Sequence, residues 1–131
     1  MIEYNLMQLL QSNNTLDVSY SVNFTTLKDD VVTVYSSSGA KPSQYEGVLT
    51  KPRYQVIVKS SDFDKATELA YNVYELLNGL ENVIMPVELK TRIIVMKVYK
   101  IAAQHEPALL GVNDDSVMEY SLNFDTQMIK V

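Results

Sequence analysis

Few side chains in this sequence have the types and spacing that catalysis or metal binding requires. His105 is the only histidine, and the adjacent Glu106 could act with it as a general acid–base pair. Adjacent side chains rarely point toward each other, however, and nothing in the sequence marks a nucleophile for the pair. We therefore predict no catalysis at this position and expect that the protein is not an enzyme.

Two pairs of adjacent acids, Asp29–Asp30 and Asp114–Asp115, invite a metal-binding interpretation. A calcium loop needs acids at alternating positions, an inner glycine and a terminal glutamate, and neither pair has that pattern. Both pairs lie where turns are expected, and Asn113–Asp114 is ordinary turn chemistry. The sequence thus predicts turns at both places, no metal site and no cofactor.

The segment KSSDFD at 59–64 joins a predicted strand to a predicted helix, a position where some proteins hold a phosphate. A phosphate would need glycines for its approach and usually a lysine beside it, whereas Asp62 and Asp64 would repel it. Helix capping explains the same residues, with Ser61 as the predicted N-cap and Asp64 completing a capping box. Gly79 is the expected residue just beyond the end of this helix.

The composition bounds the class of protein. The chain has 131 residues, a net charge of −5 and no cysteine. This length suits one domain over residues 1–131. The negative charge argues against binding to nucleic-acid phosphates, and the lack of cysteine excludes disulfides and thiolate chemistry. The N-terminus lacks the features of a secretory signal, and the apolar runs are too short to cross a bilayer, so we expect a soluble protein.

Hydrophobic periodicity predicts the elements that position these residues. Helical spacing predicts a short helix over 2–12 and a long one between Ser61 and Gly79. Period-two alternation and β-branched residues predict five strands, over 16–24, 31–36, 53–59, 92–103 and 117–124.

The remaining segments are predicted as loops. They are 37–52 and 104–116, together with 82–89, which is irregular because Pro86 blocks a helix. The order predicts an α+β fold, a mostly antiparallel twisted sheet of four to five strands. One long amphipathic helix packs on one face of the sheet, and a short helix lies at the N-terminus.

The long helix has one apolar stripe that predicts packing against the sheet. The stripe contains Phe63, Ala66, Leu69, Ala70, Val73, Leu76, Leu77 and Leu80. The helix is therefore interpreted as scaffold. Tyr71 and Tyr74 lie at the edge of the stripe and are candidates for contact with a partner.

Three segments, in order, resemble tail terminator proteins of long-tailed, siphovirus-like bacteriophages, which are often labelled minor capsid proteins. The segments are VVTVYSSSGAKP at 31–42, EGVLTKPRYQVIVKSSDFDKATELAYNVYELLNGL at 46–80 and EPALLGVNDDSVMEYSLNF at 106–124. The central part of the pattern is a proline followed by Q-V-x-V, a basic residue and a helix with an acidic first turn. The late P-x-x-L-G turn and the final alternating strand complete it.

The resemblance implies a structural role in the virion rather than catalysis. Such a protein forms a ring, commonly hexameric, on the last ring of the tail tube, stops tube polymerisation and offers a surface for head–tail joining. The implied partners are other copies of the chain, the tail tube protein and a head connector or completion protein. DNA would only pass through the channel. The implied location is the head–tail junction of the virion, reached from the host cytoplasm during assembly.

We predict that the two long loops make the subunit contacts. The candidates are Lys41, Gln44 and Tyr45 in the first loop and Leu109, Leu110 and Asn113 in the second. A further hypothesis is that Asp29, Asp30, Asp114 and Asp115 line the channel, so that passing DNA does not adhere. The alternatives are another head–tail connector or completion protein, a small cytosolic enzyme that uses His105 and Glu106, and an acidic adaptor.

Overall fold

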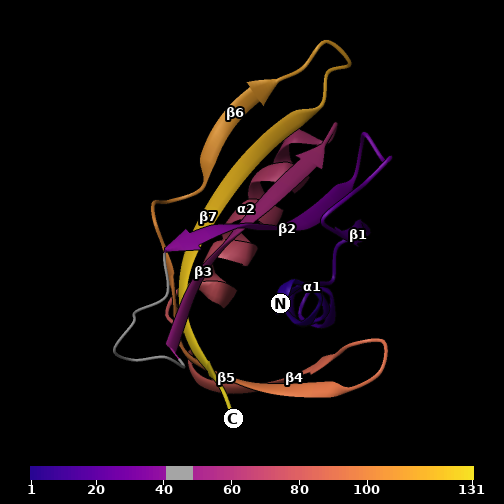
Figure 1. The fold of residues 1–131 in the computed structure, drawn as a ribbon. Coiled ribbons are helices and arrows are strands. Elements are labelled where there is room, and N and C mark those ends of the chain that lie inside the picture. Colours follow the sequence, from indigo (N-terminus) through magenta and orange to yellow (C-terminus); the bar gives the residue numbers. More distant parts are fainter. Residues whose placement is uncertain (41–48) are drawn as a thin grey trace.

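The computed structural model describes residues 1–40 and 49–131. Those residues form two helices and seven strands, labelled in Figure 1. In chain order the elements are α1 (Glu3–Ser12), β1 (Ser19–Val22), β2 (Val31–Ala40), β3 (Leu49–Ser60), α2 (Phe63–Leu77), β4 (Glu81–Glu88), β5 (Ile93–Ala103), β6 (Ala108–Val112) and β7 (Met118–Lys130).

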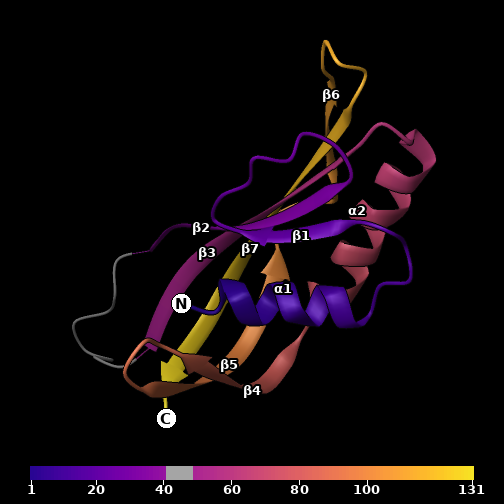
Figure 2. The ribbon, with the colours of Figure 1, turned by 90° about the vertical axis from the view of Figure 1, so that its right-hand side faces the viewer.

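The seven strands of the described residues belong to one sheet. Their hydrogen-bonded order is β1-β2-β3-β7-β5-β4, and the short β6 pairs with β7 beside that path. Neighbouring strands are antiparallel except β1 and β2, which run parallel. The sheet curls into a half-barrel, and both helices lie inside the curve (Figures 1 and 2). The sheet therefore has a concave face covered by helices and a convex face without them.

The predicted fold class is wrong. The molecule is mostly β, with a seven-stranded curled sheet and two short helices, rather than an α+β fold with one long helix on four to five strands. The helices contain ten and fifteen residues. The error has a physical origin, because two strands of this sheet have sequences that do not show the usual signals.

β4 lies in the segment that was predicted to be irregular. It contains Pro86, which pairs with Val95 on β5. β4 is the last strand of the sheet, and an edge strand tolerates proline because the missing N–H need not face a neighbour. Proline therefore excluded a helix here but did not exclude a strand.

β6 lies within the predicted loop 104–116. It pairs with the first residues of β7, with a register shift between Leu109 and Gly111. Gly111 has a φ of 125°, a conformation that side-chain-bearing residues rarely adopt. A five-residue strand interrupted by such a bulge does not alternate regularly, so its sequence resembles a loop.

The other predicted strands are confirmed, with different ends. β2, β3, β5 and β7 contain the predicted 31–36, 53–59, 92–103 and 117–124, apart from one end residue at 92 and at 117. β2 and β3 also extend into both ends of the predicted loop 37–52. The strand predicted over 16–24 is only Ser19–Val22, and it ends before Asn23, which has a φ of 60°.

The core lies on the concave face of the sheet. α2 buries Ala66, Leu69, Ala70, Val73 and Leu77. Leu76 and Leu80 are partly buried against the same cluster, whereas Phe63 remains 44% exposed. The predicted apolar stripe thus holds the helix on the sheet, except at its first residue.

The ends of α2 follow ordinary capping chemistry. The N-cap is Asp62 rather than Ser61, because the Asp62 carboxylate accepts a hydrogen bond from the Lys65 backbone N–H at 3.2 Å. The N-cap therefore lies one residue later than predicted, and Asp64 does not complete a capping box, since the third helical residue is Lys65. Gly79 follows the C-cap with a φ of 89°, as predicted.

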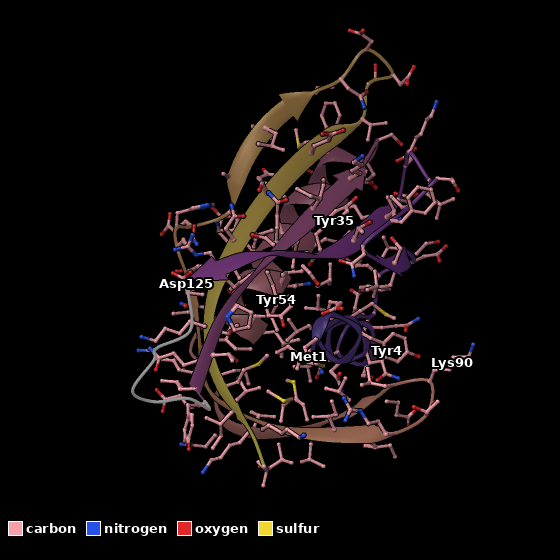
Figure 3. The ribbon with its side chains drawn as sticks, in the orientation of Figure 1. Met1, Tyr4, Tyr35, Tyr54, Lys90 and Asp125 are labelled. Carbon is pink, nitrogen blue, oxygen red and sulfur yellow. The ribbon has the colours of Figure 1, made fainter. Side chains whose placement is uncertain are left out.

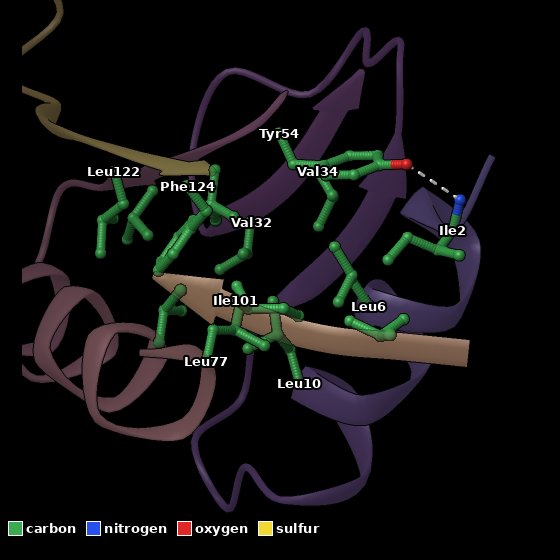
Figure 4. Close-up of a cluster of buried hydrophobic side chains, with 14 of the residues drawn as sticks. Ile2, Leu6, Leu10, Val32, Val34, Tyr54, Leu77, Ile101, Leu122 and Phe124 are labelled. Atoms are coloured by element: carbon green, nitrogen blue, oxygen red, sulfur yellow. Dashed lines mark hydrogen bonds between the residues drawn. The ribbon is translucent and has the colours of Figure 1, made fainter. Parts of the chain in front are cut away.

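α1 is held against the sheet by its apolar face and by one buried hydrogen bond. Ile2, Leu6 and Leu10 are buried in the core. The hydroxyl of Tyr54 on β3 accepts a hydrogen bond from the Ile2 backbone N–H at 3.2 Å (Figure 4). Burial raises the pKa of the Tyr54 phenol to about 12, so this hydroxyl stays protonated at physiological pH.

Candidate assembly surfaces

The β6–β7 hairpin projects from one end of the sheet (Figures 1 and 2). β6 and β5 pair with different parts of the same edge of β7: β6 with residues 118–121 and β5 with residues 124–130. β5 therefore does not pair with the part of β7 that forms the hairpin, residues 118–121.

The hairpin exposes three large apolar side chains. Leu109, Leu110 and Val112 are 55%, 59% and 47% exposed. Leu109 and Val112 pair in register with Tyr120 and Met118, and paired residues lie on the same face of a sheet. These two side chains therefore lie on the same face as α2, whose Thr67 hydroxyl contacts the Tyr120 hydroxyl at 3.0 Å, and both remain about half exposed. The prediction of a contact surface at Leu109 and Leu110 remains, now on a strand rather than a loop.

The tip of the hairpin is a turn organised by Asn113. The Asn113 side-chain oxygen accepts hydrogen bonds from the backbone N–H groups of Asp115 at 2.9 Å and Val117 at 3.1 Å. Its amide nitrogen donates to Glu119 at 3.4 Å. Asn113 therefore shapes the turn, and its side chain is committed to this role.

Asp114 and Asp115 occupy the tip and are exposed. Among the described residues, their carboxylates have no hydrogen-bond or ion-pair partner. A turn with a fixed backbone therefore presents two free negative charges.

Asp29 and Asp30 lie in a turn before β2, and their carboxylates are used within the chain. The Asp29 carboxylate accepts hydrogen bonds from the Ser61 hydroxyl and the Ser61 backbone N–H, each at 2.6 Å. Asp30 accepts from the Ser60 hydroxyl at 2.6 Å and pairs with Lys65 at 3.4 Å. The two acid pairs therefore differ: within the described residues, the carboxylates at 29–30 have hydrogen-bond partners and those at 114–115 do not.

The hydrogen bonds of Asp29 have an electrostatic consequence. The Ser61 hydroxyl, followed by the Ser61 backbone N–H, holds the pKa of the Asp29 carboxyl below its usual value. The contact ties the turn before β2 to the turn before α2. It is a structural link between two elements that are far apart in sequence.

The two predicted tyrosines of α2 differ in exposure. Tyr71 is 42% exposed, whereas Tyr74 is partly buried and packs against the core. Tyr71 can reach a partner from the outer side of α2, and Tyr74 serves mainly as packing. The predicted contacts Lys41, Gln44 and Tyr45 lie outside the described residues.

His105 and Glu106 do not form a side-chain pair. His105 Nδ1 lies 2.7 Å from the Glu106 backbone oxygen, and Nε2 lies 3.1 Å from the Asn123 amide nitrogen. Because the carbonyl accepts and the amide donates, these contacts fit a neutral ring protonated on Nδ1. The histidine thus joins the loop after β5 to β7.

The residues that the structure describes contain no group of three or more side chains suited to hold a metal ion. None of their helices is both long and apolar enough to cross a membrane.

A basic patch on the convex face was not predicted. We define it as Lys51 and Arg53 on β3 with Lys97 and Lys100 on β5. Lys51, Arg53 and Lys100 line a groove of about 370 Å³ together with Asp125 on β7. In the sequence, Lys51 and Arg53 are two residues apart, whereas Lys97 and Lys100 lie more than forty residues later. β5 joins them through pairing with β7, which no local pattern reveals.

These surfaces define a β-rich protein that offers projecting, exposed side chains to partners, with no cluster of reactive groups among the residues described. The family model described as bacteriophage tail terminator protein matches residues 9–128. The chain belongs to this family of bacteriophage tail terminator proteins, which are structural proteins of the phage. A comparison with curated proteins gave no match. Membership in the family points to a location in the virion and to interaction with tail and head proteins.

Proposed function

We propose that this chain acts as one domain over residues 1–131 and assembles into a hexameric ring on the end of the tail tube. The ring stops polymerisation of the tube and provides the surface on which the head is joined. The chain assembles in the host cytoplasm and remains at the head–tail junction of the virion. No catalytic step is part of this role.

The observation that carries the proposal is the exposed β6–β7 hairpin in a chain of this family. Leu109, Leu110 and Val112 lie together on a five-residue strand, and clustered apolar exposure marks sites of protein contact. Among the described strands β6 pairs only with β7, so its other edge has backbone groups free for a partner strand. A ring subunit needs such a surface on each copy.

The remaining contact residues are proposals of the same kind. Tyr71 on α2 and the segment that contains Lys41, Gln44 and Tyr45 are assigned to neighbouring subunits or to the tube. Asp114 and Asp115 are assigned to an interface or to the channel, because their charges have no partner in the described part of this chain.

Native mass spectrometry of the purified protein over a range of concentrations tests the ring. We expect a species near six times the subunit mass of 14.8 kDa. If the protein alone is monomeric, the same measurement is repeated with tail tube protein, which would serve as template. A chain that stays monomeric and leaves tube growth unchanged would contradict the proposal. Binding to the head connector without binding to the tube would instead favour a connector or completion role.

A further inference from the structure

Charge is distributed unevenly along β7. The hairpin at its first residue carries the free acids Asp114 and Asp115, whereas the basic patch lies beside its last third, next to Asp125 and Gln127. Asp125 and Gln127 follow Met118, the first residue of β7, by seven and nine residues, a separation of roughly 23–30 Å at the usual rise of a strand. The acidic tip and the basic patch of one copy therefore lie too far apart to meet within that copy.

A β-bulge in β5 builds the basic patch. The register between β5 and β7 shifts between Val98 and Lys100. Val98 and Ile101 are both buried, and the two residues between them, Tyr99 and Lys100, are both exposed. In a regular strand Lys100 would lie on the face opposite to Tyr99. The bulge re-aims Lys100 toward the convex face, which is a common use of this irregularity.

The convex patch remains positive after its local acids are counted. Arg53 pairs with Asp125 at 3.1 Å, and both side chains are at least half exposed. Figure 3 labels Asp125 on the side of the sheet away from α1. Glu81 lies opposite Lys100 in register. Four cations thus face two carboxylates, in a chain whose net charge is −5. Within the described residues, Lys51 and Lys100 have no ion-pair partner.

We propose that the acidic hairpin tip of one copy binds in the basic groove on the convex face of a second copy. Asp114 and Asp115 pair with Lys51 and Lys100 of that neighbour. This inference rests on the proposed ring and supplies its subunit contact. Because the two surfaces differ, the contact is head-to-tail, and head-to-tail contacts generate rings when the rotation between copies closes.

Apolar groups beside the charges support a protein partner over DNA. Tyr99 is 37% exposed and lies under Lys97, whose Nζ is 4.9 Å from the centre of the ring. An incoming hairpin would place Leu109 or Leu110 near this ring and remove apolar surface from water. A DNA backbone would neutralise the lysines but would leave the hairpin leucines uncovered, and the negative chain as a whole would repel it.

Charge reversal on each surface tests the contact. One variant carries Asp114→Lys and Asp115→Lys, and a second carries Lys51→Glu and Lys100→Glu. Each variant alone places like charges at the contact, so we expect loss of assembly by native mass spectrometry under the conditions in which the wild type assembles. An equimolar mixture restores opposite charges at every contact, and we expect assembly to return. A chain with all four substitutions should also assemble.

The control is Glu68→Lys with Glu75→Lys, which reverses two exposed acids on α2 and should assemble like the wild type. Thermal melting of each monomer checks that the fold is intact.

Assembly by both single-surface variants would overturn the inference and leave the proposed ring unaffected. Loss of assembly without rescue in the mixture would also overturn it. Duplex DNA that binds the wild type but not the Lys51→Glu, Lys100→Glu variant, with assembly unchanged, would assign the patch to phosphate instead. A wild type that forms no ring even on the tube would remove the proposed function together with the inference.

Discussion

At the scale of single residues, Tyr54 shows how one buried hydroxyl fastens a helix to the sheet. Its ring is only 1% exposed, and it packs among core residues of both layers. Its hydroxyl satisfies the Ile2 N–H at the start of the chain segment that forms α1. A backbone donor buried at this place needs an acceptor, and water cannot easily supply one.

Replacing Tyr54 with phenylalanine removes the acceptor but keeps the ring. We expect a loss of roughly 1–3 kcal/mol in the free energy of unfolding, because the Ile2 N–H is left buried and unpaired. Chemical denaturation at neutral pH measures it. The matched control is Tyr71→Phe, since Tyr71 is exposed and should change stability by less than about 0.5 kcal/mol.

The same residue predicts a pH dependence. The Tyr54 pKa is raised from 10.0 to about 12 in the folded chain, so the folded state holds its proton over a range where the unfolded state loses it. The contribution is complete below pH 10 and is lost as pH rises toward 12. Tyr54→Phe should therefore show a flatter loss of stability in this range. Equal alkaline profiles for the wild type and the variant would contradict the assignment.

At the scale of elements, the Asp29–Ser61 contact joins the entry of β2 to the entry of α2. The folded-state pKa of Asp29 lies below its usual value of 3.8, so its stabilising effect is present above that value. It is lost as pH falls through the folded pKa. NMR titration of the Asp29 carboxyl should give a midpoint below 3.8, and Ser61→Ala should move this midpoint up toward 3.8. The remote control Ser12→Ala should leave the Asp29 midpoint unchanged. If Ser61→Ala also leaves it unchanged, the proposed link between Asp29 and Ser61 is contradicted.

The elements also show what the sequence can predict. α2 and the first part of β7, up to Phe124, were recognised because each buries one face and the burial leaves a regular apolar period. β4 was missed because Pro86 is compatible with an edge strand, and edge position is a property of the whole sheet. β6 was missed because Gly111 and its bulge break the alternation.

Among the candidate contact residues, Leu109 and Leu110 were proposed from the sequence because they place apolar side chains in a turn-rich segment, and Asp114 and Asp115 were proposed because of their charge. The basic patch was not found. Its lysines lie on different strands, and the bulge at Tyr99 that brings Lys100 to the convex face is a consequence of pairing with β7. Non-local register is therefore the information that the sequence pattern lacks.

At the scale of the whole molecule, the hairpin is a projection whose apolar side chains add little to the stability of one copy. The double substitution Leu109→Ser with Leu110→Ser should change the free energy of unfolding of the monomer by less than about 0.5 kcal/mol, since both side chains are more than half exposed. Assembly should nevertheless be lost, because a partner can no longer bury them. Thermal melting and native mass spectrometry of the same samples separate the two effects.

Phe24→Ser is the matched control for this variant, because Phe24 is 73% exposed and lies in the segment after β1, outside the hairpin. It should assemble like the wild type. A hairpin variant that assembles normally would show that Leu109 and Leu110 do not contribute to the contact. A variant that melts much earlier would show that the leucines support the monomer, which their exposure argues against. Loss of assembly with unchanged stability of the monomer is the outcome that identifies the hairpin as an interface. It would show that the exposed leucines of this chain serve the assembled state rather than the fold of one copy.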